Sequence, residues 1–99
     1  MIYRSRPLLD MARGAPCMHC GSYSPTVVAA HSNQQRDGKG IGIKAHDYRV
    51  AFLCADCHTL VDASPIPRET KVALWEDAHR KTIGWLFEHG HLEVRRCPK

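Results

Sequence analysis

The chain lacks the long apolar run that a membrane-spanning helix requires. No stretch approaches roughly 18 consecutive apolar residues, and the opening MIYRSRPLLDMARGAP has no extended apolar core of the kind found in secretory signals. Internal repeats and low-complexity tracts are also absent from the sequence. We therefore expect a cytoplasmic chain, without membrane association, whose thiols stay reduced.

The chain is also too short to form a large hydrophobic core. Its 99 residues predict one domain spanning residues 1–99. A chain of this size buries roughly 60–65% of its unfolded surface, so its hydrophobic core is marginal. A bound metal or a set of disulfides would help such a chain to fold.

Negative charge is scarce in the first half of the sequence. The chain carries 14 Lys and Arg against 10 Asp and Glu, a net charge of +4. Residues 1–54 hold seven basic and three acidic side chains, whereas residues 55–99 hold seven of each. The basic half is the part that we expect to face a polyanion, if the chain binds one.

Turn residues and periodicity predict an α+β fold. Ser5 and Pro7 are typical of the start of a short helix over residues 5–13. The short β-branched run TVVAAH and a second run, YRVAFL, predict an antiparallel pair of strands joined by a polar, glycine-rich loop, and two helical segments follow. The strands are expected at 26–31 and 48–53, the loop at 32–44, and the helices at 58–63 and 67–89.

The last predicted helix has an apolar stripe that should pack on the small sheet. Pro67 suits its first turn and Gly90 suits its end. We interpret Gly84 within the helix as a point of close packing beside Trp85. The stripe comprises Val72, Trp75, His79, Ile83 and Leu86.

The most distinctive motifs of the sequence are two CxxC pairs. Cys17-x2-Cys20 and Cys54-x2-Cys57 are separated by a spacer of 33 residues (21–53). Four thiolates suit a closed, tetrahedral zinc site that stabilises the fold. The alternatives are two disulfides, a redox-active CxxC, or replacement of one cysteine ligand by His19. The fifth cysteine, Cys97, is then expected to be a free surface thiol.

The order of these motifs resembles the HNH endonucleases, also called the His-Me finger or ββα-metal family. The segments that carry the resemblance are CMHC, VVAAHSNQ, GKGIGIKAHD and LCADCHTLVD. The similarity is greatest to small phage and prophage members, which include the YbcO-like family and the phage recombination-enhancement nuclease. It covers roughly residues 12–64, and more loosely the packing helix at about 67–90.

The resemblance implies a zinc-stabilised ββα-metal core and a role for several residues. His31 corresponds to the general base that takes a proton from the attacking water. Asp47, with His46 as a near competitor, corresponds to the middle residue that holds the base in place. His58 corresponds to the ligand of a catalytic Mg²⁺ or Mn²⁺ ion, and Asp62, four residues later on the same helical face, offers that ion an oxygen ligand.

One position departs from the pattern of the family. Many members carry an aspartate or a second histidine directly before the base, where it ligates the metal, and this chain has Ala30 there. A different ligand, weak metal binding and loss of activity all remain open. The sequence thus predicts a metal-dependent DNA endonuclease of low sequence specificity. Its rivals are a zinc-finger-like module that binds DNA or protein without cutting, and a thiol oxidoreductase.

Overall fold

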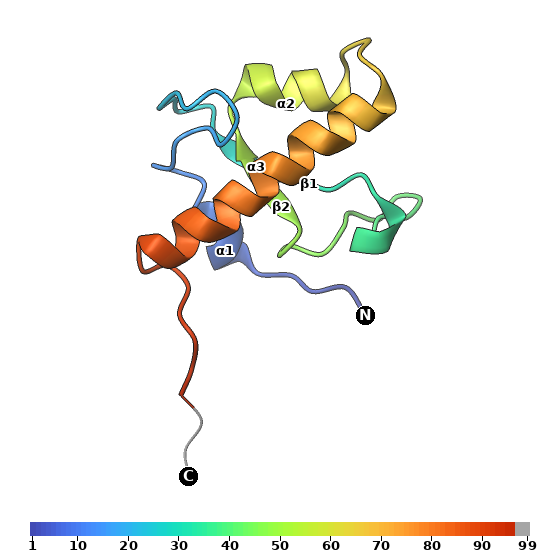
Figure 1. The fold of residues 1–99 in the computed structure, drawn as a ribbon. Helices are drawn as coiled ribbons and strands as arrows, with labels where there is room; N and C mark the ends of the chain where they lie inside the picture. Colours follow the sequence, from blue (N-terminus) through green and yellow to red (C-terminus); the bar gives the residue numbers. More distant parts are fainter. Residues whose placement is uncertain (97–99) are drawn as a thin grey trace.

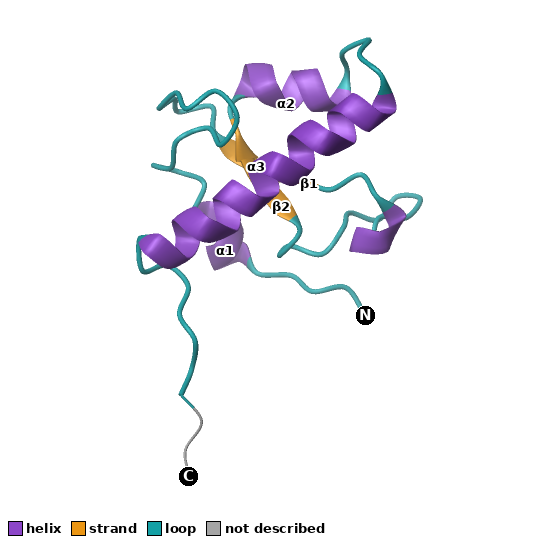
Figure 2. Cartoon of the chain, in the orientation of Figure 1, coloured by secondary structure: helices purple, strands orange, loops and turns teal. Residues whose placement is uncertain are grey.

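The structure, a computed structural model, describes residues 1–96 and has a small α+β fold (Figures 1 and 2). A two-stranded antiparallel sheet is combined with three α-helices and one 3₁₀ turn in this part of the chain. In chain order the elements are α1 (Arg6–Asp10), β1 (Val28–His31), η1 (Gln35–Asp37), β2 (Val50–Leu53), α2 (Ala55–Asp62) and α3 (Arg68–Glu88). The predicted order of helices and strands is therefore confirmed, and residues 97–99 lie outside the described range.

The ends of the helices follow the capping residues. The Ser5 hydroxyl accepts a hydrogen bond from the Leu8 backbone N–H and caps α1. Pro67 is the N-cap of α3 rather than a residue of its first turn. After α3, Gly90 adopts a φ of 76°, which is the left-handed conformation that commonly ends a helix. Helix α2 begins at Ala55, earlier than predicted, so that Cys57 and His58 lie in its first turn.

The core lies between the sheet and α3. Figure 1 shows α3 crossing over β2, and all four residues of β2 are buried. Trp75 and Leu86 of α3 are buried in the same apolar cluster as the strand residues, and the Trp75 indole N–H donates to the Ala30 carbonyl at 3.0 Å. Trp85 is only half-buried and meets Phe52 edge to face.

Two polar side chains of α3 form hydrogen bonds with the edge of β2 that does not pair with β1. The Thr82 hydroxyl accepts a hydrogen bond from Phe52 N–H at 3.0 Å and donates to Ala78 O at 2.8 Å. The His79 Nδ1 lies 2.7 Å from the Val50 carbonyl, to which it donates. Without these contacts, backbone groups of β2 would be buried without hydrogen-bond partners. This explains why the apolar face of α3 includes a buried threonine and a buried histidine.

No helix among residues 1–96 is both long and apolar enough to cross a lipid bilayer.

The interpretation of Gly84 as a close-packing point is wrong. A Cβ atom built at Gly84 would meet no heavy atom within 4 Å. The glycine therefore lowers the helix propensity of α3 without allowing any closer contact.

We expect Gly84→Ala to raise the free energy of unfolding by about 0.5–1 kcal/mol, because alanine has the higher helix propensity and finds open space. Chemical denaturation at saturating zinc measures the change. Gly90→Ala is the matched control and should destabilise, since its φ of 76° is unfavourable for alanine. A loss of stability in Gly84→Ala would contradict the open environment of this position.

Candidate functional site

The two CxxC pairs converge on one point. The Sγ atoms of Cys17, Cys20, Cys54 and Cys57 all lie within 4.8 Å of one another, and the four cysteines form no disulfide. The Sγ atoms of Cys20 and Cys54 are 3.8 Å apart. Zn–S bonds of about 2.3 Å in a tetrahedron place sulfurs about 3.8 Å apart. The donor set therefore fits a structural metal such as zinc.

Backbone hydrogen bonds hold the two CxxC pairs close together. The Gly21 N–H donates to Cys17 O, which closes the first turn, and Met18 N–H donates to Phe52 O, which attaches that turn to β2. The second pair spans the junction of β2 and α2, where His58 N–H donates to Cys54 O. The cluster thus joins residues 17–20 to the start of α2.

The sulfurs differ in acidity. Hydrogen bonds from the Ser22 hydroxyl and backbone lower the pKa of Cys20 to about 6. Burial and the neighbouring sulfurs raise the pKa of Cys57 above its ordinary value. The metal-free cluster therefore retains protons at neutral pH, and a bound cation would displace them. His19 is exposed and is not part of the cluster, and Cys97 lies outside the described residues.

His31 and Asp47 form a close pair. The His31 Nε2 lies 2.8 Å from the Asp47 Oδ1, and the two side chains are 15% and 3% exposed. A carboxylate accepts hydrogen bonds, so Nε2 carries the proton and donates it. No described residue hydrogen-bonds to the opposite nitrogen, Nδ1. The residue predicted to hold the base is therefore in contact with it.

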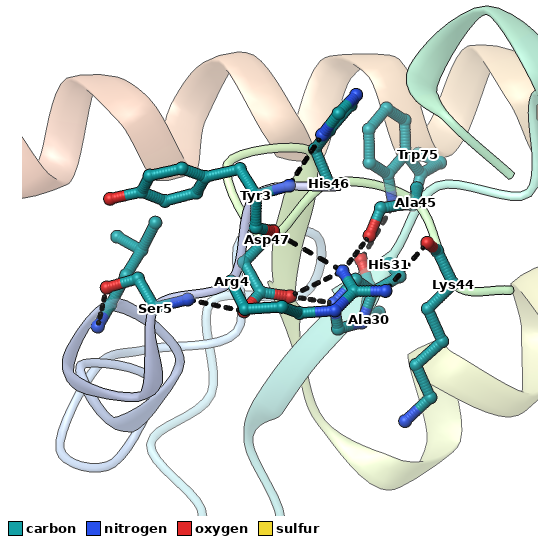
Figure 3. Close-up of polar contacts among 11 residues, drawn as sticks. Tyr3, Arg4, Ser5, Ala30, His31, Lys44, Ala45, His46, Asp47 and Trp75 are labelled. Atoms are coloured by element: carbon teal, nitrogen blue, oxygen red, sulfur yellow. Dashed lines mark hydrogen bonds and ion pairs between the residues drawn. The ribbon is translucent and has the colours of Figure 1, made fainter. Parts of the chain in front are cut away.

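The N-terminal segment holds Asp47 in place (Figure 3). The Arg4 guanidinium contacts Asp47 Oδ1 at 3.1 Å, and the Ser5 backbone N–H donates to Oδ2 at 2.7 Å. Arg4 also donates to the carbonyls of Ala45 and Lys44. Sequence reasoning missed Arg4 and Ser5, because their distance along the chain from Asp47 gives no signal of contact.

The Asp47 carboxylate is ionised at neutral pH. Burial raises its pKa, but the hydrogen bonds from His31 and Ser5 and the charge of Arg4 outweigh this effect and hold the pKa below its ordinary value. The corresponding stabilisation is fully present above the ordinary carboxyl pKa and is lost as pH falls through the lowered value. His46 has a different role, since it accepts a hydrogen bond from Tyr3 N–H and stacks on Tyr48.

His58 and Asp62 form a second pair on α2. The His58 Nε2 lies 2.9 Å from Asp62 Oδ2, which confirms that the two side chains share one helical face. The Asn33 side-chain amide donates to Asp62 Oδ1 at 3.1 Å. Both members of the pair are more than one-third exposed, at 37% and 46%. The pair therefore places an imidazole nitrogen and a carboxylate oxygen side by side, and both are atom types that bind metal ions.

His31 and the pair His58 and Asp62 border one cleft of about 310 Å³. His31 lies at the end of β1, and His58 and Asp62 lie on α2. Lys39 and Lys44 come from the loop between the strands and line the same cleft. The side chains that line the cleft therefore include two imidazoles, one carboxylate and two cationic amines.

Ala30 does not border this cleft. Alternate residues of a strand face opposite sides, and Ala30 is buried in the core, at 2% exposure, while His31 and Ala29 line the cleft. Within residues 1–96 the four cysteines are the one group of three or more His, Cys, Asp or Glu side chains that converge as ligands. Among the described residues that line the cleft, His58 and Asp62 are in contact, but no third His, Cys, Asp or Glu side chain converges with them.

The fold and the site define a small α+β domain with a four-cysteine cluster suited to a metal. Comparisons with known proteins found no family model, no curated protein and no solved structure that matches this chain.

We expect the purified chain to carry one zinc ion and Cys54→Ser to lose both the ion and the fold, because ligation energy is folding energy. Elemental analysis and far-UV circular dichroism measure the two losses. Cys97→Ser is the control and should retain zinc, since four sulfurs complete a tetrahedral shell. A Cys54→Ser protein that is folded without metal would refute the structural role of the cluster.

Asp47→Asn should lower the free energy of unfolding by about 1–3 kcal/mol at pH 7, because three hydrogen bonds lose their charged acceptor. Asp77→Asn is the matched control. Its ion pair with Lys81 is exposed, and we expect a change below about 0.5 kcal/mol. Urea denaturation of both variants with bound zinc makes the comparison, and equal effects would mean that Asp47 has no special role in stability.

Proposed function

We propose that the protein is a metal-dependent endonuclease of the HNH type that hydrolyses phosphodiester bonds in DNA. One observation carries the proposal. A histidine held by a buried carboxylate shares a cleft with a second histidine–carboxylate pair and with two lysines. The cleft thus combines a base, ligands for a cation and positive charge for a phosphate.

His31 is the general base of the proposed reaction. Its Nε2 donates to Asp47, so Nδ1 holds the free lone pair and takes a proton from the attacking water. A neutral imidazole suits this role near pH 7. Asp47 then stabilises the imidazolium that forms, and Arg4 and Ser5 keep the carboxylate in position.

His58 and Asp62 would hold a divalent ion, Mg²⁺ or Mn²⁺, with water completing its shell. When bound, such an ion stabilises the charge that develops on the phosphorus oxygens and on the leaving oxygen. An ion held by both residues would replace the proton on His58 Nε2, because Nε2 and Asp62 Oδ2 lie only 2.9 Å apart and would then both be available as ligands. Asn33 steadies the carboxylate from the other side.

Lys39 and Lys44 give the cleft its attraction for the substrate. Neither lysine forms an ion pair within residues 1–96, so both charges remain available to a phosphate. Contacts of this kind bind the DNA backbone without reading its sequence. We therefore infer low sequence specificity.

A zinc-finger-like module that binds DNA without cutting is the second candidate function. The position of Ala30 in the core favours it, because the neighbour of the base then provides no metal ligand. A cleft with two preformed ligands holds a cation less tightly than one with three or more. Cleavage assays separate the two functions.

We expect the zinc-loaded protein to nick supercoiled plasmid DNA when Mg²⁺ or Mn²⁺ is added, and His31→Ala to lower the rate by roughly 100-fold or more through loss of the general base. Gel assays of the nicked form measure the rate. His91→Ala is the matched control, because His91 is exposed beyond α3 and does not line the cleft.

Two outcomes would contradict this proposal. Nicking by His31→Ala at the wild-type rate would remove His31 as the base. DNA binding by the wild-type protein without nicking under either metal would favour the binding module.

A further inference from the structure

A second cleft adjoins the histidine cleft and has no role in the mechanism above. It has a volume of about 690 Å³ and lies between the N-terminal residues around α1 and the strand β1. Both clefts are lined by Ala29, His31 and Lys44. They therefore meet at His31 and form one groove, with the proposed base at the junction.

The charge of this second cleft is mainly positive. Arg6 and Arg13 line it together with Lys44, against a single carboxylate, Asp10. Arg13 is exposed and forms no ion pair within the described residues. Arg6 lies 3.6 Å from Asp10, but both side chains are largely exposed, so solvent screens this pair. Two to three cations are thus available to an anionic ligand.

The backbone of β1 adds hydrogen-bond donors to the groove. The Ser32 N–H donates to the Arg49 carbonyl, and residues of an antiparallel pair alternate between bonding to the partner strand and pointing away from it. By this alternation, Ala29 and His31 direct their N–H groups away from β2. No backbone carbonyl of a loop or turn among the described residues accepts a hydrogen bond from either group. Backbone N–H groups without a partner are among the contacts that bind phosphate oxygens.

We propose that the cleft between α1 and β1 binds the DNA strand that flanks the scissile phosphate on one side of the cut, with Arg13 as its principal phosphate contact. This inference rests on the proposed function. A groove that passes through His31 holds phosphates on both sides of the base, which suits a continuous strand better than a strand end. The short helix α1 is then part of the substrate site as well as of the fold.

The test is the salt dependence of DNA binding by the full, zinc-loaded chain in the His31→Ala background, without added Mg²⁺ or Mn²⁺. Fluorescence anisotropy of a labelled oligonucleotide duplex gives the affinity. Arg13→Gln should weaken binding roughly tenfold at 0.1 M salt and reduce the slope of log affinity against log salt by about one, as expected for one lost phosphate contact. The matched control is Arg80→Gln, an exposed arginine of α3 that lines neither cleft.

Four outcomes separate the possibilities. A loss in Arg13→Gln that is absent in Arg80→Gln supports the groove. Equal losses, or none, overturn the groove but leave the nuclease proposal intact, since nicking by the wild-type protein tests that separately. A complete absence of DNA binding in both the wild-type protein and the His31→Ala protein overturns both proposals.

Discussion

The convergence of four cysteine sulfurs is the constraint on which the rest of the structure depends. The cluster ties the turn at residues 17–20 to the point where β2 ends and α2 begins. His58 follows Cys57 directly, so the cluster also sets the start of the helix that carries His58. Strand β2 pairs with β1, whose last residue is His31. One metal site can therefore position both histidines in a chain whose core is small.

A second, polar constraint acts at the other side of the cleft. Asp47 is buried, and a buried carboxylate is costly unless it is paired. His31, Arg4 and the Ser5 backbone pair with it, so the N-terminal segment and the end of β1 are joined through one side chain. This arrangement fixes the ring of His31 more firmly than the strand alone could.

Local signals in the sequence predict the helices, the strands and the cysteine ligands. Spacing is sufficient for the CxxC pairs and for His58 with Asp62, because a turn or a helix fixes these separations. The contact of Arg4 with Asp47 and that of Thr82 with Phe52 join segments far apart in the sequence, so only tertiary packing reveals them. The error at Gly84 arose because a glycine within a helix has no local sign that distinguishes close packing from open space.

We propose that His31 and His58 face one cleft that binds a divalent ion. Paramagnetic broadening of histidine ring signals by Mn²⁺, in the zinc-loaded protein, tests this claim most directly. We expect the ring signals of His31 and His58 to broaden together at low Mn²⁺ concentrations, while His89 and His91 beyond α3 keep narrow signals. Broadening of neither ring, or of His58 without His31, would contradict it.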